Sequence, residues 1–266
     1  MKNLINVSVL AAINAGKEIL EVYKQDFSVE TKSDNSPLTI ADKKSHEVIK
    51  AALANTGYPL LSEEGKQLAY DERKDWETFW LVDPLDGTKE FIKKNGEFTV
   101  NIALVKNGTP VLGVVYVPVT GVLYYGAEGK GSFAVTIKED VTESNLESIL
   151  AAAETLPGAA KPAVYTVVAS RSHNTPETEA FIEEKRKEFG EVDMVSSGSS
   201  IKLCLVAEGK ANVYPRLAPT MEWDTAAGHG VAKFAGCTVY NYETKNEVVY
   251  NKENLLNPWF VVERKN

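Results

Sequence analysis

The first 25 residues carry apolar side chains at alternating steps of four and three, the spacing of one face of an amphipathic helix. A signal peptide would need an unbroken apolar core, whereas polar residues interrupt this segment. No later stretch approaches the roughly 18 apolar residues of a membrane span. We therefore expect an opening helix and a cytoplasmic protein. The apolar positions are Ile5, Val9, Ala12, Gly16, Ile19 and Tyr23, and the interrupting residues are Asn3, Asn6, Ser8 and Asn14.

The rest of the first half has the pattern of one more helix followed by strands. Residues 39–53 place Ile40, Val48, Ile49 and Ala52 on a shared helical face. Short runs rich in β-branched and aromatic residues then predict strands, and a glycine-rich turn at residues 126–131 closes the series. The predicted strands are residues 59–62, 79–82, 98–105, 111–117 and 122–125.

The second half alternates between strand-like and helix-like segments. Between residues 138 and 162 the composition shifts to Glu, Ser and Ala, which indicates a linker or variable excursion. We therefore predict an N-terminal α+β unit at residues 1–137 and a C-terminal α/β unit at residues 163–266, with a ligand cleft between them. The predicted strands are residues 164–169, 191–195, 211–214 and 238–240, and the predicted helices are residues 177–189, 200–207 and 224–235.

Composition narrows the classes of function. The 266 residues are 44% apolar and 25% charged, as in an ordinary globular protein. A formal net charge of −8 argues against general binding to DNA or RNA but leaves room for a small phosphorylated ligand. Cys204 and Cys237 stand alone in apolar surroundings, so we expect buried thiols and neither a disulfide nor a zinc site.

Two aspartates flank Pro84-Leu85 at the end of an apolar run, in Asp83-Pro84-Leu85-Asp86-Gly87. The plain interpretation is a turn, because Asp often opens turns and Pro favours their second position. Such a turn also brings its first and fourth residues within about 7 Å of each other. Two carboxylates that close would repel, and a hard divalent cation such as Mg²⁺ would relieve the repulsion. The motif therefore predicts either a turn or half of a metal site.

Further acids occur at similar boundaries. Glu63-Glu64 follows another short apolar run, Asp42 fits a capping box with Thr39, and Asp224 fits a helix N-cap. Each has an ordinary explanation when it is taken alone: a solvated loop pair or a helix cap. Loops at one edge of an α/β sheet gather in space, however, so the acids together indicate a shared site.

The amino-acid sequences of these segments resemble the motifs of the lithium-sensitive, magnesium-dependent phosphatase superfamily, which includes the inositol monophosphatases. The resemblance runs from about Asp34 to Gly236, and it implies a layered αβαβα sandwich. Residues 89–104 and 214–220 are most similar to bacterial 3'(2'),5'-bisphosphate nucleotidases of the CysQ type. The four matching motifs are residues 34–42, 62–65, 83–91 and 223–228.

The resemblance implies a role for each acid. It assigns Mg²⁺, as two or three ions, to Glu63, Asp83, the Leu85 carbonyl, Asp86 and Asp224. Two such ions about 4 Å apart can position a water and stabilise the leaving oxygen of a phosphate ester. Asp42 and Thr88 match the water-orienting pair of this superfamily, and Glu64 is assigned to tuning a metal-bound water.

A nucleotide with two phosphates needs cationic contacts beyond the metal. Residues 196–202 form a Gly-Ser turn that opens a helix, where backbone N–H groups suit an anion. The resemblance implies that these and neighbouring residues bind the nucleotide. The plainer interpretation of the same residues is a flexible serine loop with basic side chains at the surface. His229 is expected to be structural and His46 to be exposed. The assigned substrate-binding residues are Gly87, Thr88, His173, Ser199, Lys202, Arg216 and Asp224.

The resemblance implies a phosphoric monoester hydrolase that converts adenosine 3',5'-bisphosphate to AMP and phosphate. Sulfate assimilation produces this bisphosphate, so the expected role is to clear it. The resemblance also implies inhibition by lithium. The alternatives are an inositol or sugar monophosphatase of the same superfamily, and a non-catalytic sensor of nucleotide and metal. The motifs of serine hydrolases, zinc proteases and Walker-type loops do not occur in the sequence. Nothing encodes a membrane anchor, although relatives of this type associate with the inner face of the cell membrane, and a homodimer is left open.

Overall fold

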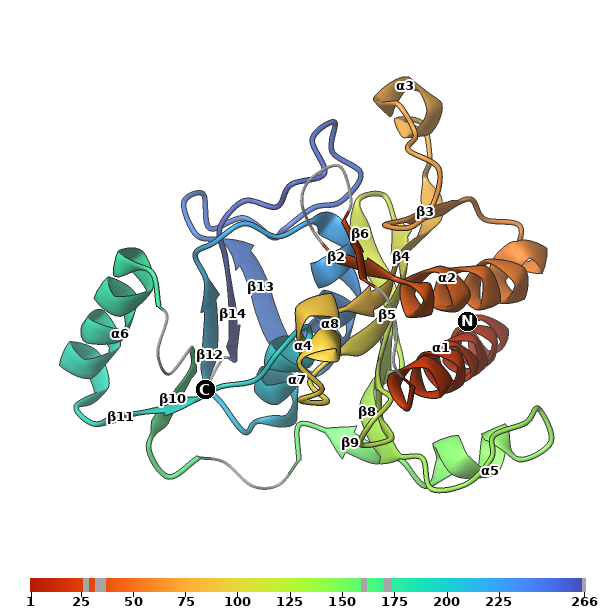
Figure 1. Cartoon of the computed structure of the whole chain (residues 1–266). Coiled ribbons are helices and arrows are strands. Elements are labelled where there is room, and N and C mark those ends of the chain that lie inside the picture. Colours follow the sequence, from red (N-terminus) through yellow and green to blue (C-terminus); the bar gives the residue numbers. More distant parts are fainter. Residues whose placement is uncertain (26–28, 32–36, 159–161, 170–173, 265–266) are drawn as a thin grey trace.

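The computed structural model describes residues 1–25, 29–31, 37–158, 162–169 and 174–264. Its outer layer on one side consists of two long helices, α1 and α2 (Figure 1). Predicted residues 39–53 form α2, and Thr39 caps it by accepting a hydrogen bond from the Ala41 N–H at 3.1 Å. The segments on this side are α1 (Lys2–Tyr23), α2 (Ile40–Leu53), a 3₁₀ turn (Ala54–Thr56), and the short antiparallel pair β1 (Val29–Thr31) and β2 (Pro37–Thr39).

A twisted sheet lies beneath these helices and contains all the strands predicted for the first half. The described strands follow the chain in order across the sheet; β3 and β4 are parallel and every other neighbouring pair is antiparallel. The strands are β3 (Leu60–Ser62), β4 (Thr78–Asp86), β5 (Thr99–Lys106), β6 (Thr109–Val117), β7 (Val122–Ala127), β8 (Gly131–Thr136) and β9 (Glu154–Leu156). Three short helices connect some of these strands along the chain: α3 (Tyr70–Arg73), α4 (Thr88–Ile92) and α5 (Leu146–Ala151).

The second half forms a smaller mixed sheet, with helices on both of its faces. Its order is β11-β10-β12-β14-β13, where β10 runs parallel to β11 and β12 and the other pairings are antiparallel. The strands are β10 (Tyr165–Val168), β11 (Val192–Val195), β12 (Val213–Arg216), β13 (Cys237–Asn241) and β14 (Phe260–Arg264). The helices are α6 (Pro176–Phe189), α7 (Ile201–Glu208) and α8 (Glu222–Phe234).

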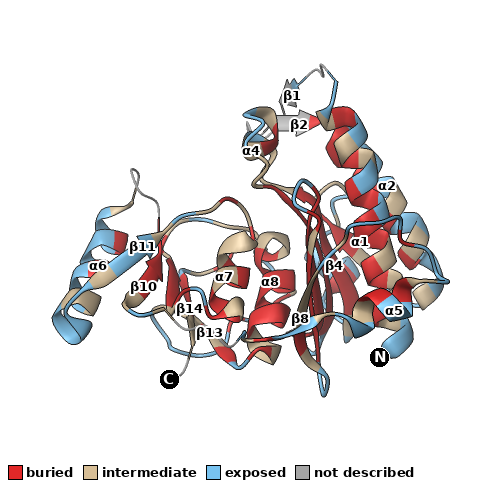
Figure 2. Ribbon diagram, turned by 90° about the horizontal axis from the view of Figure 1, so that it is seen from below, coloured by how far each residue is buried: buried red, intermediate tan, exposed pale blue. Residues whose placement is uncertain are grey.

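Helices α7 and α8 lie between the two sheets, which gives the predicted five-layer αβαβα sandwich (Figures 1 and 2). Buried side chains fill both faces of the larger sheet, toward α1 and α2 on one side and toward α7 and α8 on the other. Helix α8 approaches the sheet closely at Gly113 of β6, where a side-chain carbon would lie 2.2 Å from the Ala227 carbonyl oxygen. Only glycine allows α8 to pack this closely on the sheet.

The predicted division at residues 138–162 stays a prediction. This segment contains α5 and β9, and β9 pairs with β8 to extend the first sheet. Within the described chain, no helix combines the length and apolar character needed to cross a membrane. Both cysteines are buried free thiols, as expected.

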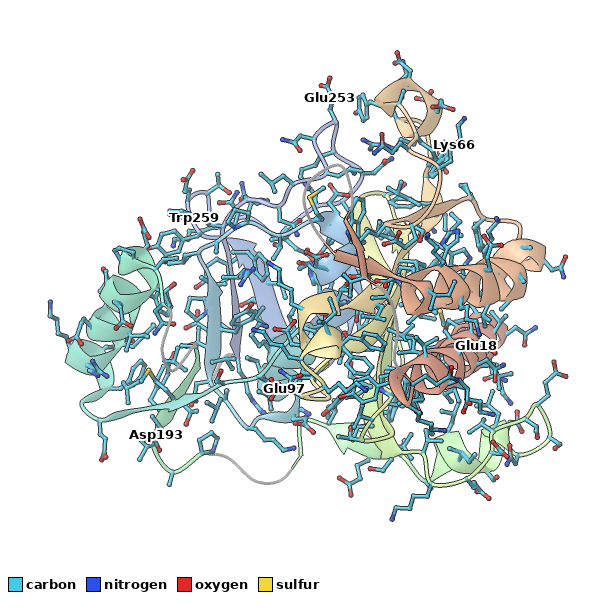
Figure 3. All side chains as sticks on the ribbon, in the orientation of Figure 1. Glu18, Lys66, Glu97, Asp193, Glu253 and Trp259 are labelled. Atoms are coloured by element: carbon cyan, nitrogen blue, oxygen red, sulfur yellow. The ribbon has the colours of Figure 1, made fainter. Side chains whose placement is uncertain are left out.

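A buried arginine of α3 forms hydrogen bonds with a loop at residues 251–253, about 180 residues later in the sequence. The Arg73 side chain is 2% exposed and donates to Asn251 Oδ1 at 2.8 Å, to the Lys252 carbonyl at 2.7 Å and to the Glu253 carbonyl at 2.9 Å. The two segments lie side by side near the labelled Lys66 and Glu253 (Figure 3).

We predict that Arg73→Ala lowers the free energy of unfolding by about 2–3 kcal/mol, because it removes three half-buried hydrogen bonds made by a charged donor. Urea unfolding would measure the loss. The neighbouring Lys74 pairs with Asp71 at the surface, so Lys74→Ala serves as a control and should cost less than about 1 kcal/mol. Equal, small losses for both variants would show that Arg73 contributes no more than a surface cation.

Candidate metal centre and substrate pocket

The acids predicted to share a site come from three segments that meet at one edge of the larger sheet. Strands β3 and β4 are parallel neighbours, so their carboxyl ends lie together, and the Glu63 N–H donates to the Val82 carbonyl at 3.1 Å. Glu63 follows β3, Asp83 lies near the end of β4, and Asp224 lies in the first turn of α8. Helix α8 packs across this sheet and brings the third acid to the ends of the two strands.

Glu63, Asp83 and Asp224 each place a carboxylate oxygen within 4.8 Å of the other two. Burial, followed by the charges of Glu63, Asp86 and Asp224, raises the pKa of Asp83 well above its usual range. Burial and the nearby Asp86 and Glu63 raise the pKa of Asp224 to about 8. Ionised carboxylates this close destabilise one another unless a cation lies among them. The donors are all oxygens, which suits a hard divalent cation.

Asp83 and Asp86 do not form the plain turn expected from Asp-Pro-Leu-Asp. Strand β4 continues to Asp86, and its pairing with β5 shifts register between Asp83, opposite Asn101, and Asp86, opposite Thr99. The Leu85 N–H donates to Asp83 Oδ1 at 3.0 Å, while the Pro84 carbonyl accepts from Ser45 Oγ of α2 at 2.7 Å. An irregular strand end held by α2 thus replaces the predicted turn.

Asp224 is also placed differently from the prediction. Helix α8 begins at Glu222 with Met221 as its N-cap residue, so Asp224 is the third helical residue and not the cap. Its Oδ2 accepts a hydrogen bond from the Met221 N–H at 2.9 Å, which satisfies one free donor of the first turn. One carboxylate oxygen thereby anchors the helix start.

Asp42 and Thr88, predicted as a water-orienting pair, are in contact. Thr88 Oγ1 lies 3.2 Å from Asp42 Oδ1, and the Leu85 carbonyl lies 3.4 Å from the same hydroxyl. Asp42 Oδ2 accepts from the N–H and hydroxyl of Thr39, at 2.8 and 2.6 Å. Asp42 is 1% exposed, so the capping interaction and the contact with Thr88 coexist in a buried carboxylate. Gly87, with φ of 93°, turns the chain from β4 into α4 at this point.

A pocket adjoins the acids and is lined by residues predicted to bind substrate. One cavity of about 230 Å³ includes Asp86, Gly87, Ser199, Asp224 and Thr225 in its walls. A second, of about 370 Å³, extends toward Glu97 (Figure 3) and α6. Four residues line both cavities: Glu90, Lys202, Tyr214 and Arg216.

The cations of this pocket are partly engaged by backbone carbonyls. Lys202 Nζ donates to the Ser197 carbonyl at 3.3 Å, and Arg216 Nη2 donates to the Pro219 carbonyl at 3.0 Å. Within the described part of the chain, the buried Arg216 Nε and Ser199 Oγ have no hydrogen-bond partner. Polar groups this buried without a partner are uncommon.

The roles assigned to two positions stay predictions. His173 lies outside the described residues. Glu64 follows Glu63 in the turn after β3, but among the described acids it is not a member of the close group. A larger cavity of about 450 Å³ lies beside His229 and Lys233 and is lined by none of the predicted metal ligands.

The structure contradicts the expectation for His46 and agrees with the one for His229. His46 is buried, not exposed, and its Nδ1 lies 2.9 Å from Ser62 Oγ, so the prediction of an exposed side chain is wrong. The helical pattern missed this contact because it involves β3, a neighbour distant in sequence. His229 is fully buried between Tyr250 Oη at 2.9 Å and Glu247 Oε1 at 3.2 Å, consistent with a structural role.

The sequence analysis missed Asn101 and Ser200, which contact Asp86. Asn101 is 0% exposed in the middle of β5, and Ser200, 1% exposed, precedes α7. The sequence did offer a signal for Asn101, which interrupts the apolar residues of a predicted strand. An amide buried in a strand needs a hydrogen-bond partner, and the carboxylates of Asp-Pro-Leu-Asp were candidates.

The profile of the inositol monophosphatase family matches residues 1–263. The chain is 46% identical over 255 residues to the 3'(2'),5'-bisphosphate nucleotidase CysQ of Shigella flexneri, which covers 94% of this chain and 96% of that protein. CysQ from Bacteroides thetaiotaomicron has a similar crystal structure, with a TM-score of 0.87, 53% identity and coverage of 98% and 96%. The suhB protein of Bartonella henselae gives a TM-score of 0.71 at 25% identity, with coverage of 99% and 94%.

Proposed function

Because this chain belongs to the inositol monophosphatase family, we propose that it is a phosphatase which hydrolyses the 3'-phosphate of adenosine 3',5'-bisphosphate to AMP and phosphate. The observation that carries the proposal is the close group of Glu63, Asp83 and Asp224, because Asp224 also lines the pocket that contains Lys202 and Arg216. The similarity to CysQ proteins favours a bisphosphorylated nucleotide over an inositol or sugar monophosphate. The role in sulfate metabolism follows from this substrate.

The cation proposed is Mg²⁺, because carboxylate and carbonyl oxygens are its preferred ligands. Glu63, Asp83 and Asp224 would hold one ion, and the Leu85 carbonyl and Asp86, which lie outside that group, would help to hold another. Bound Mg²⁺ lowers the pKa of a water and screens the negative charge of the phosphate. Isothermal titration of the protein with Mg²⁺ would measure the number of ions.

Thr88 and Asp42 are proposed to orient the attacking water. With its proton directed to Asp42 Oδ1, the Thr88 hydroxyl presents a lone pair that can accept a hydrogen bond from water. Asp42 is itself fixed by Thr39, so the hydroxyl has a defined direction. When the water attacks phosphorus, the new P–O bond forms and the bond to the ribose 3' oxygen breaks. The water loses one proton and the 3' oxygen gains one, so the step is balanced. Glu64 is proposed to tune the water from the turn beside Glu63.

Phosphate release in the presence of Mg²⁺ tests the proposal. We expect adenosine 3',5'-bisphosphate to be hydrolysed to 5'-AMP much faster than inositol 1-phosphate or fructose 1,6-bisphosphate, and EDTA to stop the reaction. Equal or faster turnover of inositol phosphate would assign the protein to the monophosphatases. Nucleotide binding without any turnover would indicate a sensor.

We predict that Arg216→Ala lowers kcat/KM for the bisphosphate by about 10–100-fold, because a charged hydrogen bond to the second phosphate is worth about 1.5–3 kcal/mol. Hydrolysis of para-nitrophenyl phosphate, which has no second phosphate, should change by less than about threefold. Steady-state kinetics at saturating Mg²⁺ would measure both. Arg186 pairs with Glu183 on the outer helix α6, so Arg186→Ala is the matched control. Equal losses on both substrates would exclude a role in binding the second phosphate.

A further inference from the structure

One oxygen of Asp86 is the meeting point of a buried network. Asp86 Oδ2 accepts from the Ser200 N–H at 2.7 Å, and it lies 2.8 Å from Ser200 Oγ and 3.3 Å from Asn101 Nδ2. Thr99 Oγ1 is more distant, at 3.4 Å, and lies closer to Asn101 Oδ1, at 3.1 Å. In the described part of the chain, all the hydrogen bonds that this carboxylate accepts are made by Oδ2. Oδ1 accepts none of these bonds, and Asp86 lines the same cavity as Asp224.

Ser200 connects Asp86 to the other side of the site. Its hydroxyl accepts from Asn101 Nδ2 at 2.8 Å and lies 2.7 Å from the Asp224 backbone carbonyl. A hydroxyl has a single proton, so Ser200 Oγ donates either to Asp86 or to that carbonyl, while its backbone N–H stays on Asp86. Strand β4 and helix α8, which carry two of the proposed ligands, are therefore joined through one residue.

The same residue belongs to the loop that enters the substrate pocket. Ser200 follows Ser199, whose φ of 42° is in the left-handed region, and precedes Lys202 in the first turn of α7. Ser199 and Lys202 both line the cavity beside Asp86. A change in the position of Ser200 would move the loop and Asp86 together.

Burial makes this network strong. Ser200, Asn101 and Thr99 are each at most 1% exposed, so water cannot replace a lost donor easily. Residues that hold a metal ligand in place typically contribute 10–100-fold to metal affinity.

We propose that Ser200 is a positioning residue that fixes Asp86 for the cation and couples it to the nucleotide-binding loop. This inference rests on the proposed function, since it assumes that Asp86 is a metal ligand and that the loop receives the nucleotide. Ser200 does not touch the reacting atoms in this arrangement; it acts through Asp86.

Binding of Mn²⁺ to the substrate-free protein, followed by electron paramagnetic resonance of the free ion, tests the inference without an activity assay. Mn²⁺ is an oxygen-ligated substitute for Mg²⁺. Ser200→Ala should weaken Mn²⁺ binding about tenfold, and Ser200→Thr, which keeps the hydroxyl, should restore it to within about threefold. Should the alanine variant not fold, Ser200→Cys, with a weak donor of similar size, should show the same loss.

The control is Ser132, a buried serine whose hydroxyl donates at 2.7 Å to the carbonyl of Val231, seven residues after Asp224 on α8. Ser132→Ala should leave Mn²⁺ binding unchanged. In an Asp86→Asn background, Ser200→Ala should have less than a twofold further effect, because the carboxylate through which it acts is gone.

The outcomes separate the two proposals. Unchanged Mn²⁺ binding in Ser200→Ala, with normal hydrolysis of the bisphosphate by the unaltered protein, would overturn the positioning role and leave the function standing. Independent, multiplicative losses in the double variant would overturn it as well. Absence of both Mn²⁺ binding and turnover in the unaltered protein would instead contradict the proposed function.

Discussion

Asp83→Asn should lower kcat/KM for the bisphosphate by about 10³-fold or more while leaving the protein folded. Asp83 is 2% exposed and lies among Glu63, Asp86 and Asp224, so its charge is central to any cation held there. The amide is nearly isosteric and can still accept from the Leu85 N–H, but it is a weaker ligand and carries no charge. Loss of one preorganised electrostatic group in a buried site commonly costs 10²–10³ in rate, and a shared metal ligand should cost at least as much.

Steady-state kinetics and Mn²⁺ binding on the same variant would measure both effects. Asp193, exposed on β11 at the edge of the smaller sheet, provides the matched control, and Asp193→Asn should behave as the unaltered protein (Figure 3). Retained activity in Asp83→Asn would remove the acidic group from the mechanism. Loss of activity together with loss of folding would show that Asp83 is needed for the structure, and urea unfolding distinguishes the two cases.

The assembly of the acids was predictable because it depends on local rules. Apolar strands that end in acids and helices that begin with them place carboxylates at element boundaries, and parallel neighbours such as β3 and β4 align those boundaries. The layered fold followed from the family resemblance, and the helix periods of α1 and α2 follow from the spacing of their apolar residues.

The rest of the site depends on contacts between segments distant in sequence. The irregular end of β4 is set by its register with β5 and by Ser45 of α2, neither of which is visible in the Asp-Pro-Leu-Asp motif. Ser200 donates to Asp86, from which it is separated by 114 positions in the sequence, and Asn101 donates to Ser200 over a separation of 99 positions. Arg73 and its loop on residues 251–253 are a comparable case, since neither segment has a pattern that indicates the other. Side-chain networks of this kind follow from tertiary packing and not from periodicity.

In the absence of a cation, the protein should become less stable as the pH rises from about 4 to about 8. An unfolded aspartate titrates near 3.8, whereas burial and neighbouring carboxylates raise the pKa of Asp224 to about 8 and that of Asp83 well above its usual range. Between these values the folded protein holds protons that the unfolded chain releases, so the free energy of unfolding falls with rising pH. The slope is up to about 1.4 kcal/mol per pH unit for each such group.

Urea unfolding in EDTA at several pH values between 5 and 8.5, repeated at saturating Mg²⁺, would measure this dependence. Asp224→Asn removes one raised group, so the metal-free variant should be the more stable protein at pH 8 and should show a shallower slope. Mg²⁺ binds the ionised carboxylates and should stabilise the unaltered protein most at high pH. If the metal-free protein were instead more stable at pH 8 than at pH 5.5, and Asp224→Asn left that difference unchanged, the buried acids could not be mutually destabilising. The electrostatic reason for a cation at this edge of the sheet would then be lost.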